Sequence, residues 1–342
     1  MKKSSVIIFG PLLIAMLVLA SSPSESASGE IIKWKAQTLF GKQDTSFAQA
    51  KIFTDEVYKK TGGKLVIDWF GPGDLVPPPE MISSCGAGVV EMIMTGFPFD
   101  SNWIPEAMVA MGLPGSWQTY DQCMKYFKQF GALEFFRESY AKQNLYLLGP
   151  IPFGRFVYMT GSKKLGSPFD MKGLKVWGRP PMAFVTKELG GQHADLPNEE
   201  LYMALKLGTI DGMTYSIPEL KTMGFYEVVK YLYKPAPIKV GNIEMSISMS
   251  AWKALGPELQ KEVQNVFENV LYKMYKTSSD MEEDALIFFK SKGGTVVEWS
   301  ANDMVKMRAV YDKVWNGIAS KDARNTEAIE ILRNFVKAEG IK

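Results

Sequence analysis

The sequence predicts an α/β fold of two similar lobes braced by one long helix. Three patterns in its 342 residues lead to this prediction. Strand-like and helix-like segments alternate over residues 30–150, the alternation restarts after residue 150, and residues 256–292 have helical spacing almost throughout. An alternation of strands and helices is typical of a largely parallel sheet covered by helices.

Each element in the first half is predicted from the spacing of its apolar residues. Apolar residues at every second position predict strands, and apolar residues three or four apart predict amphipathic helices. Gly62 and Gly63 are expected to end the first helix, because glycine readily adopts the conformation that closes a helix. The expected strands are residues 31–40, 64–70, 89–95 and 145–149, and the expected helices are residues 45–60, 80–87 and 120–142.

The second half follows the same rules. The expected strands are residues 156–160, 173–177, 209–214 and 243–250, and the expected helices are residues 182–189, 199–207, 256–292, 302–321 and 326–338. If the helix over residues 256–292 is unbroken, it spans roughly 50 Å, enough to brace both lobes. Residues 277–280, Thr-Ser-Ser-Asp, are the expected position of any kink or division in it.

A short pattern occurs once in each half and suggests that the two lobes are alike. Gly88 and Gly208 each follow a glutamate by eight residues and precede an acidic residue by three. Glycine at this place can adopt a left-handed conformation, which lets the chain leave a helix and enter the next strand directly. The interpretation is two similar α/β lobes that face a cleft.

The N-terminus has the layout of a bacterial secretory signal peptide. Lys2 and Lys3 precede an apolar run over residues 6–20, and residues 21–29 are small and polar. Residues 1–27 are therefore predicted to be a signal peptide, which directs the chain to the periplasm and is removed there. The alternative is an uncleaved anchor, although about twenty apolar residues are needed to span a bilayer. No later segment has the pattern of a membrane span, so the mature chain is not expected to be membrane-embedded.

Composition argues against most enzyme classes. His193 is the one histidine in the sequence. A metal site with several histidines is therefore excluded, and a catalytic triad would have to use His193. The sequence has no CxxC, no P-loop and no dinucleotide fingerprint. We expect no catalytic residue, no metal site and no cofactor.

The charge and the cysteines say little more. A net charge of +2 does not indicate a surface that binds nucleic acid. Cys85 and Cys123 leave open whether a disulfide forms.

Two arginines are suited to holding an anion. Arg155 lies at the expected crossing between the lobes, and Arg179 lies just after a strand end. The guanidinium group binds a carboxylate through two hydrogen bonds and stays charged in a desolvated cleft. A surface or interlobe ion pair is the alternative for each.

Several segments together resemble the solute-binding proteins of tripartite ATP-independent periplasmic (TRAP) transporters, of the DctP-like kind. The resemblance runs from about residue 31 to residue 320, in order and with matching spacing. The matching segments are residues 75–77 (Leu-Val-Pro), 153–155 (Phe-Gly-Arg), 160–164 (Thr-Gly-Ser-Lys-Lys), 169–176 (Phe-Asp-Met-Lys-Gly-Leu-Lys-Val), 189–191 (Leu-Gly-Gly), 196–197 (Leu-Pro), 200–208 (Glu-Leu-Tyr-Met-Ala-Leu-Lys-Leu-Gly), 210–212 (Ile-Asp-Gly) and 225–231 (Phe-Tyr-Glu-Val-Val-Lys-Tyr).

The resemblance implies a two-lobed periplasmic binding protein, or Venus-flytrap, fold. Both lobes close over one ligand, a long helix bridges them, and the ligand passes to membrane permease subunits driven by a sodium gradient. The expected boundaries are residues 30–152 with about 240–275 for lobe 1, residues 153–239 with about 283–320 for lobe 2, residues 256–292 for the bridging helix and residues 321–342 for a C-terminal helix.

The chain departs from the family at the ligand site. The family usually places an arginine directly after Gly-Leu-Lys-Val, where it clamps the ligand carboxylate, and this sequence has Trp177 there. Either Arg179 restores the charge, since a two-residue step along a strand keeps the same face, or Trp177 provides a stacking wall for a less acidic ligand. Arg155 matches a second arginine that many members use.

Aromatic residues and one amide complete the predicted site. Tyr215 stands where the family usually has polar residues, and four further residues follow strand ends, where open α/β sheets present ligand contacts. These four are Phe40, Phe97, Phe99 and Asn102. Lobe packing is the alternative for each. The bias toward aromatic rings predicts an aromatic or medium-chain organic acid as the ligand.

Together these observations predict an exported, non-enzymatic protein that captures a small organic acid for a TRAP permease. One alternative is an exported binding protein that serves a sensor kinase or an ATP-driven permease, and another is a neutral aromatic ligand stacked on Trp177. A hydrolase or lyase on an α/β scaffold is disfavoured by the single histidine. The identity of the ligand, metal co-binding and the oligomeric state stay open.

Overall fold

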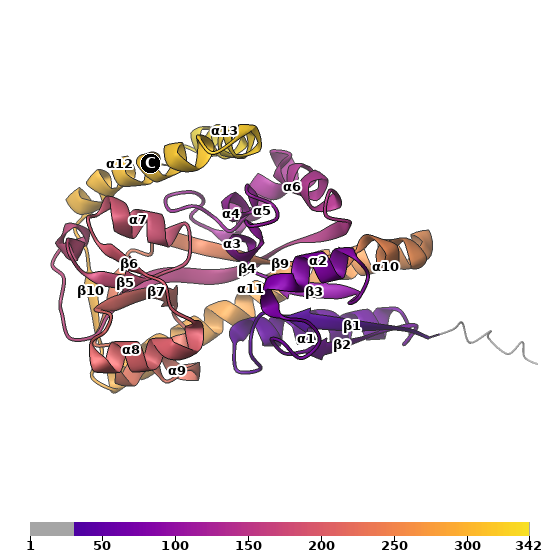
Figure 1. The fold of residues 1–342 in the computed structure, drawn as a ribbon, viewed down its shortest axis with the longest axis horizontal. Coiled ribbons are helices and arrows are strands. Elements are labelled where there is room, and N and C mark those ends of the chain that lie inside the picture. The colour runs from indigo at the N-terminus through magenta and orange to yellow at the C-terminus, as the bar shows by residue number, and fades with distance from the viewer. Residues whose placement is uncertain (1–30, 342) are drawn as a thin grey trace, which may run out of the picture. The chain divides into compact units, whose positions relative to one another are not determined.

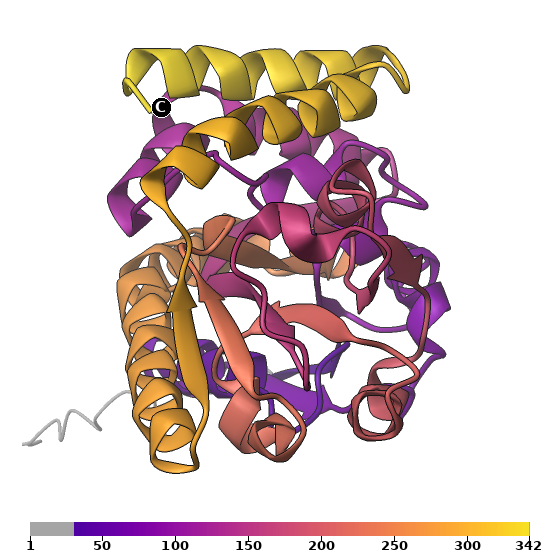
Figure 2. The same ribbon diagram turned by 90° about the vertical axis from the view of Figure 1, so that its left-hand side faces the viewer.

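The computed structural model describes residues 31–341 (Figures 1 and 2). The predicted signal peptide, residues 1–27, lies outside the described residues. The strands are β1 Ile32–Thr38, β2 Leu65–Phe70, β3 Met92–Thr95, β4 Leu145–Thr160, β5 Lys175–Trp177, β6 Gln192–Ala194, β7 Gly212–Ser216, β8 Tyr231–Lys234, β9 Ile238–Ser248 and β10 Thr295–Glu298. The helices are α1 Thr45–Lys60, α2 Met81–Gly86, α3 Phe97–Asp100, α4 Ala107–Ala110, α5 Tyr120–Gln129, α6 Ala132–Ala141, α7 Met182–Glu188, α8 Leu201–Leu207, α9 Glu219–Thr222, α10 Met249–Ala254, α11 Gly256–Ser291, α12 Ala301–Ala319 and α13 Ala323–Ala338. Short 3-10 turns occupy Pro78–Glu80, Pro168–Met171, Asn198–Glu200 and Phe225–Glu227.

The strands form one curled, mixed sheet rather than a largely parallel one. Its order is β2-β1-β3-β9-β4-β7-β5-β6, and off this path β8 pairs with β4 and β10 pairs with β8. Neighbours are parallel within β1–β3 and within β5–β7, whereas β9 runs antiparallel to β3 and β4, and β4 runs antiparallel to β7. The prediction of parallel strands therefore holds for two groups, which appear at opposite ends of the sheet in Figure 1, but was wrong for the strands that join them.

The two predicted strands over residues 145–149 and 156–160 are one continuous strand, β4. The prolines between them do not end it: Pro150 lies opposite Glu244 and Pro152 opposite Asn242 in β9. Three register shifts interrupt this pairing between residues 147 and 156. Proline lacks the N–H that a ladder needs and is tolerated in strands beside such irregularities, which explains why the sequence signal was misleading.

The long helices differ from the prediction in opposite ways. The helix expected over residues 120–142 is divided into α5 and α6 at Gly131, whose φ of 76° lies in the left-handed region. By contrast, α11 continues through residues 277–280 as a single helix of 36 residues. Ser278 is buried there and accepts a hydrogen bond from Gln49 Nε2 of α1 at 3.0 Å, so a polar residue that suggests a break instead contacts a neighbouring helix.

Helix α11 joins two separate hydrophobic clusters. Residues of its first half, including Val263 and Phe267, pack with α1 and β1–β3, while Ala285 and Phe289 of its second half pack with β7 and α8. It also contacts α9 and β10. These contacts fit the predicted bridging role, and the lobe boundaries given above stay a prediction.

Several smaller sequence predictions can be compared directly with the structure. Gly88 and Gly208 both have positive φ, 77° and 71°, as expected for the repeated helix-to-strand element. Cys85 and Cys123 are both buried and free, so no disulfide joins them. Within residues 31–341, no helix is both long and apolar enough to cross a membrane.

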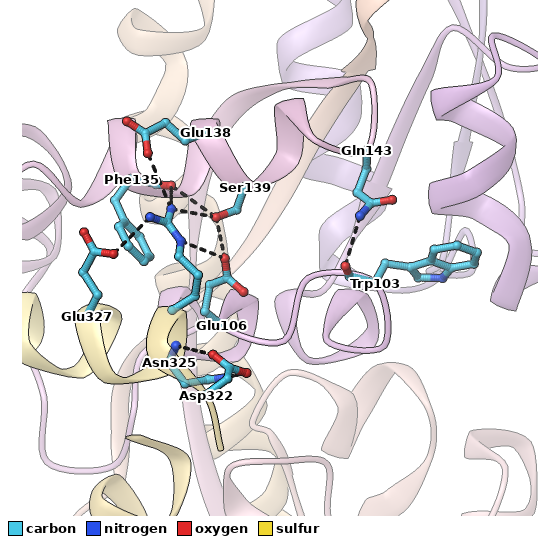
Figure 3. A network of polar contacts seen from close by, with 10 residues as sticks. Trp103, Glu106, Phe135, Glu138, Ser139, Gln143, Asp322, Asn325 and Glu327 are labelled. Carbon is cyan, nitrogen blue, oxygen red and sulfur yellow. Dashed lines mark hydrogen bonds and ion pairs between the residues drawn. The ribbon is translucent and has the colours of Figure 1, made fainter. Parts of the chain in front are cut away.

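Helices α12 and α13 lie side by side over α4, α6 and α7 (Figure 2). Arg324, in the first turn of α13, fixes this arrangement. Its guanidinium carbon lies 3.7 Å from the centre of the Phe135 ring, and Nη2 donates to Phe135 O and Ser139 Oγ, both at 2.9 Å. Nε lies 3.5 Å from the buried carboxylate of Glu106 (Figure 3). One cation therefore satisfies acceptors on two neighbouring elements.

Arg324→Ala is expected to lower the free energy of unfolding by about 2–3 kcal/mol, because it leaves the Glu106 carboxylate buried without a cation. Urea unfolding measures this loss. Arg333→Ala is the matched control, since Arg333 lies exposed on the same helix, and it should change stability by less than about 0.5 kcal/mol. Equal losses in the two variants would contradict the role given to Arg324.

Candidate ligand-binding site

A cavity lies where the ends of the parallel strands meet the crossing strands. Its wall combines residues from both parallel groups and from β4 and β9. Those used below are Phe40, Asp44, Phe99, Trp177, Arg179 and Tyr215. The same residues except Trp177 also line an adjoining, more open space. Open α/β sheets present ligand contacts at the carboxyl ends of their strands, and the cavity occupies this position.

Arg179 is the cation of this cavity. Its guanidinium carbon lies 4.9 Å from the centre of the Phe99 ring and 5.4 Å from that of Trp177. Nη2 makes a long contact of 3.4 Å with Asn198 Oδ1, and Nε is buried with no hydrogen-bond partner among the described residues. A buried donor without a partner is costly, so this guanidinium is suited to accept an anion.

Trp177 forms part of the wall beside Arg179. Its indole N–H donates to Leu196 O at 2.9 Å, which fixes the ring. The ring stacks on Tyr215, with 5.6 Å between centres and 23° between planes. Arg179 follows β5 by two residues and reaches the same cavity. Trp177 stands at the position of the family arginine, but the cavity wall still has a cation. That cation is the guanidinium of Arg179, which contacts the face of the Trp177 ring.

Two buried acids, Asp100 and Glu244, lie beside the turn that carries Phe99. Asp100 accepts hydrogen bonds from Thr95 Oγ1 at 2.7 Å and from the Tyr140 hydroxyl at 2.5 Å, and Thr95 Oγ1 is also in hydrogen-bond contact with Glu244 of β9. Burial raises the pKa of both carboxyl groups, and Asp100 raises that of Glu244 further. The pair therefore retains a proton, which lets two acids share one buried site.

A second pair of acids lies at the edge of the cavity. Asp44 is the N-cap of α1, with Oδ1 accepting from Ser46 N at 2.8 Å. Glu219 of α9 is fully buried and accepts from Thr45 Oγ1 at 3.3 Å and from Ser216 Oγ. Burial, and then the charge of Asp44, raises the pKa of Glu219 to about 8. The first turn of α1 and the start of α9, distant in sequence, are thus joined by one carboxyl group.

Arg155 lies elsewhere. Its Nε donates to Glu282 Oε2 of α11 at 2.7 Å, and its backbone N–H donates to the other oxygen of the same carboxylate at 2.5 Å. The Glu282 side chain is 4% exposed and that of Arg155 is 36% exposed. The structure does not bring Arg155 to the cavity wall that holds Arg179. A role for it in ligand binding stays a prediction.

The remaining predicted residues divide into three groups. Phe40, Phe99, Trp177 and Tyr215 line the cavity with Arg179, and Asn102 lines only the adjoining space. Phe97 is fully buried, with its ring 6.4 Å from those of Phe136 and Tyr140, because the helical turn of α3 directs it into the core while Phe99 faces the cavity.

Sequence reasoning did not identify Asp44 as a wall residue. A signal was present, because an aspartate directly before a predicted helix that follows a strand end marks an N-cap at the ligand-binding edge of a sheet. Asn242 and Ile243 were missed as well. They lie in the middle of β9, and no local pattern shows that this part of a crossing strand faces a cavity.

The arrangement can hold a small anion between aromatic rings. Among residues 31–341, no group of three or more histidine, cysteine, aspartate or glutamate side chains is placed to hold a metal ion.

The fold and this cavity are those of a two-lobed periplasmic binding protein. Residues 36–322 match the model of the family described as bacterial extracellular solute-binding protein, family 7 (DctP). The chain therefore belongs to this family of TRAP transporter solute-binding proteins, a family of transport proteins rather than of enzymes. The predicted family and two-lobed fold class are confirmed.

Three similar proteins illustrate the range of the family. A monocarboxylate 2-oxoacid-binding periplasmic protein of Nostoc sp. is 24% identical over 308 residues, covering 90% of this chain and 84% of that protein. The sialic acid-binding periplasmic protein SiaP of Vibrio cholerae is 27% identical over 284 residues, covering 82% and 86%. The structure of a TRAP periplasmic solute-binding protein from Desulfovibrio salexigens with bound orotic acid is 21% identical, with a TM-score of 0.80 over 90% of this chain and 99% of that one.

Glu219→Gln tests the buried acid that joins α1 to α9. The folded protein keeps the Glu219 proton up to a pKa of about 8, whereas an unfolded glutamate loses it near 4.5. The unfolded state therefore binds fewer protons in this range, and the contribution of Glu219 to stability falls as the pH rises from about 5 to 8. The free energy of unfolding should decline less between these pH values in the variant than in the wild type.

Urea unfolding at several pH values measures both slopes. The acids outside this pair are present in both proteins, so the difference between the slopes reports Glu219 together with Asp44, whose titration is linked to it. The exposed Glu298, changed to glutamine, is the control and should follow the wild type. Parallel curves for Glu219→Gln and wild type would show that Glu219 is ionised in the folded protein.

Proposed function

We propose that this protein captures a small organic acid, an aromatic or medium-chain carboxylate, in the periplasm and delivers it to the membrane permease subunits of a TRAP transporter. The observation that carries the proposal is the Arg179 guanidinium, held between the rings of Phe99 and Trp177 with a buried donor left unpaired. Export by the predicted signal peptide supplies the route to the periplasm.

The composition of the wall supports the class of ligand. Arginine recognises carboxylates through its planar set of donors, and aromatic faces contact flat or apolar ligand bodies. Orotic acid, bound in the similar protein from Desulfovibrio salexigens, combines a ring with a carboxylate. The Nostoc and Vibrio proteins are named for binding 2-oxoacids and sialic acid, which are acids as well.

Lobe closure is part of the proposal. Phe99 follows β3 and Trp177 ends β5, so the two rings beside Arg179 come from different parallel groups of the sheet. A ligand that contacts both groups only when they are close together binds the closed arrangement more tightly than the open one. This difference in affinity stabilises the closed arrangement. Such a closed state is what the permease subunits would receive.

A thermal-shift screen of the purified protein tests the ligand class. Aromatic and medium-chain acids are compared with their amides, which keep the ligand body and lose the charge. A saturable rise in melting temperature with one class of acid, absent with its amide, is the expected result. Stabilisation by the neutral amides instead would indicate the alternative, a neutral aromatic ligand stacked on Trp177.

Arg179→Gln is expected to weaken binding of the best acid at least tenfold, about 1.4 kcal/mol or more, because it removes the charge and shortens the donor group. Isothermal titration calorimetry measures the dissociation constant. The exposed Arg333→Gln is the control and should leave it unchanged. If Arg179→Gln binds the acid as the wild type does, Arg179 is not the carboxylate partner.

Arg155→Ala decides the second predicted arginine by the same measurement. If its guanidinium leaves Glu282 for the ligand, the variant should also bind the acid at least tenfold more weakly, about 1.4 kcal/mol. An unchanged dissociation constant would remove Arg155 from the site and leave it as an ion pair between β4 and α11.

A further inference from the structure

The cavity that holds Arg179 also carries an acid that no cation neutralises. Asp44 lines both the cavity and the adjoining space, as Arg179 does. Within residues 31–341 its carboxylate accepts a hydrogen bond from Ser46 N through Oδ1 and pairs with no lysine or arginine. One wall therefore presents an acid that forms no ion pair with a described lysine or arginine and a guanidinium with one buried donor unpaired.

The two groups belong to independently placed elements. Asp44 is fixed by its capping bond at the start of α1, and Arg179 is fixed between two aromatic rings after β5. Among the described residues, the side-chain hydrogen bonds of Asp44 and Arg179 go to Ser46 N and to Asn198 Oδ1, neither of which carries a charge. A ligand that contacts both would bring α1 and β5 into one interaction.

Charge balance indicates what such a ligand carries. Burial raises the pKa of both Asp44 and Glu219, that of Glu219 to about 8, so Glu219 holds its proton at neutral pH and Asp44 is the member of the pair that ionises first. A simple carboxylate beside Arg179 would leave Asp44 as an uncompensated negative charge next to a negative ligand. Interactions between charges are strong in a partly desolvated cavity, so this arrangement is unfavourable. A second, positive group on the ligand removes the conflict.

We infer that the cavity selects amino-carboxylates, ligands whose carboxylate binds Arg179 and whose ammonium group binds Asp44 while an apolar body lies among the aromatic rings. This inference rests on the proposed function and narrows its ligand class. An ammonium donates up to three hydrogen bonds and accepts none, which suits a carboxylate that forms no ion pair with a described lysine or arginine.

Matched ligand pairs test the inference by calorimetry on the purified protein. Phenylalanine is compared with 3-phenylpropanoate, and 4-(aminomethyl)benzoate with 4-methylbenzoate, so that the ammonium lies either beside the carboxylate or at the far end of the ring. At least one amino acid should bind at least tenfold more tightly than its partner without nitrogen. The hydroxy acid 3-phenyllactate should bind more weakly than phenylalanine if that pair shows the preference.

Asp44→Asn separates charge from structure. Asparagine caps a helix as well as aspartate does, so α1 is retained while the negative charge is lost. The variant should bind the preferred amino acid at least tenfold more weakly and its partner without nitrogen as tightly as before or more tightly. Asp322→Asn is the matched control, because Asp322 caps α13 through the same kind of bond to Asn325 N, and it should change neither affinity.

The outcomes distinguish this inference from the proposed function. Acids that bind equally well with and without nitrogen, or an Asp44→Asn variant that weakens both members of a pair equally, would overturn the inference and leave carboxylate capture standing. If no acid of either kind binds, the proposed function fails and the inference fails with it. If the phenylalanine pair shows the preference, binding of 3-phenyllactate as tight as that of phenylalanine would overturn the assignment of an ammonium.

Discussion

The antiparallel pairing of β4 with β9 is the constraint on which the rest of the structure depends. It runs from Leu145 opposite Ser248 to Phe156 opposite Ile238 and is the only link in the strand order between the two parallel groups of the described sheet. Phe153 and Phe156 of β4, together with Asn242 and Ile243 of β9, also line the cavity. The same strands that join the two groups therefore form part of the ligand-binding wall, so movement of one group against the other must change the cavity.

Helix α11 limits that movement from behind. Its first half packs with α1 and its second half with the elements around β7, and Glu282 between them pairs with Arg155 of β4. The two N–H groups of Gln49 Nε2, on α1, lie within hydrogen-bond distance of three acceptors, Pro152 O, Met274 O and Ser278 Oγ, so one amide connects α1, β4 and α11. Buried polar contacts of this kind specify one arrangement more strongly than apolar contacts do. The strands that form the cavity wall are thus also tied to α11.

The sequence predicted what depends on local patterns and missed what depends on distant pairing. Helix α1 was predicted with its bounds, and Gly88 and Gly208 were predicted in their conformation, since apolar spacing and glycine act locally. The direction of β4 and β9 was not predicted, because a buried strand has the same composition whether its neighbours are parallel or antiparallel. Pro150 and Pro152 suggested a break that bulged pairing removes.

The candidate site shows the same division. Phe40, Phe99, Trp177, Arg179 and Tyr215 were selected because they follow or end strands or match the family pattern, and all five line the cavity. Phe97 was selected by the same rule and lies in the core, since strand-end position alone does not determine which way a side chain turns. The capping role of Asp44 could be predicted from the sequence, but its neighbour Glu219 could not, because Glu219 and Thr45 are 174 residues apart and only the fold brings them together.

The position of Arg179 explains how a tryptophan can replace the arginine of the family pattern without removing the charge. An arginine inside β5 would have its stem fixed by the strand, whereas Arg179 lies beyond the strand end and is oriented by two rings, 4.9 Å and 5.4 Å from its guanidinium carbon. The face of an aromatic ring attracts a cation without using its N–H donors. The ring of Trp177 therefore holds the guanidinium in place while leaving its hydrogen bonds for another group. Because Phe99 comes from the other parallel group, the guanidinium contacts rings of both groups, and this pair of contacts depends on the distance between the groups.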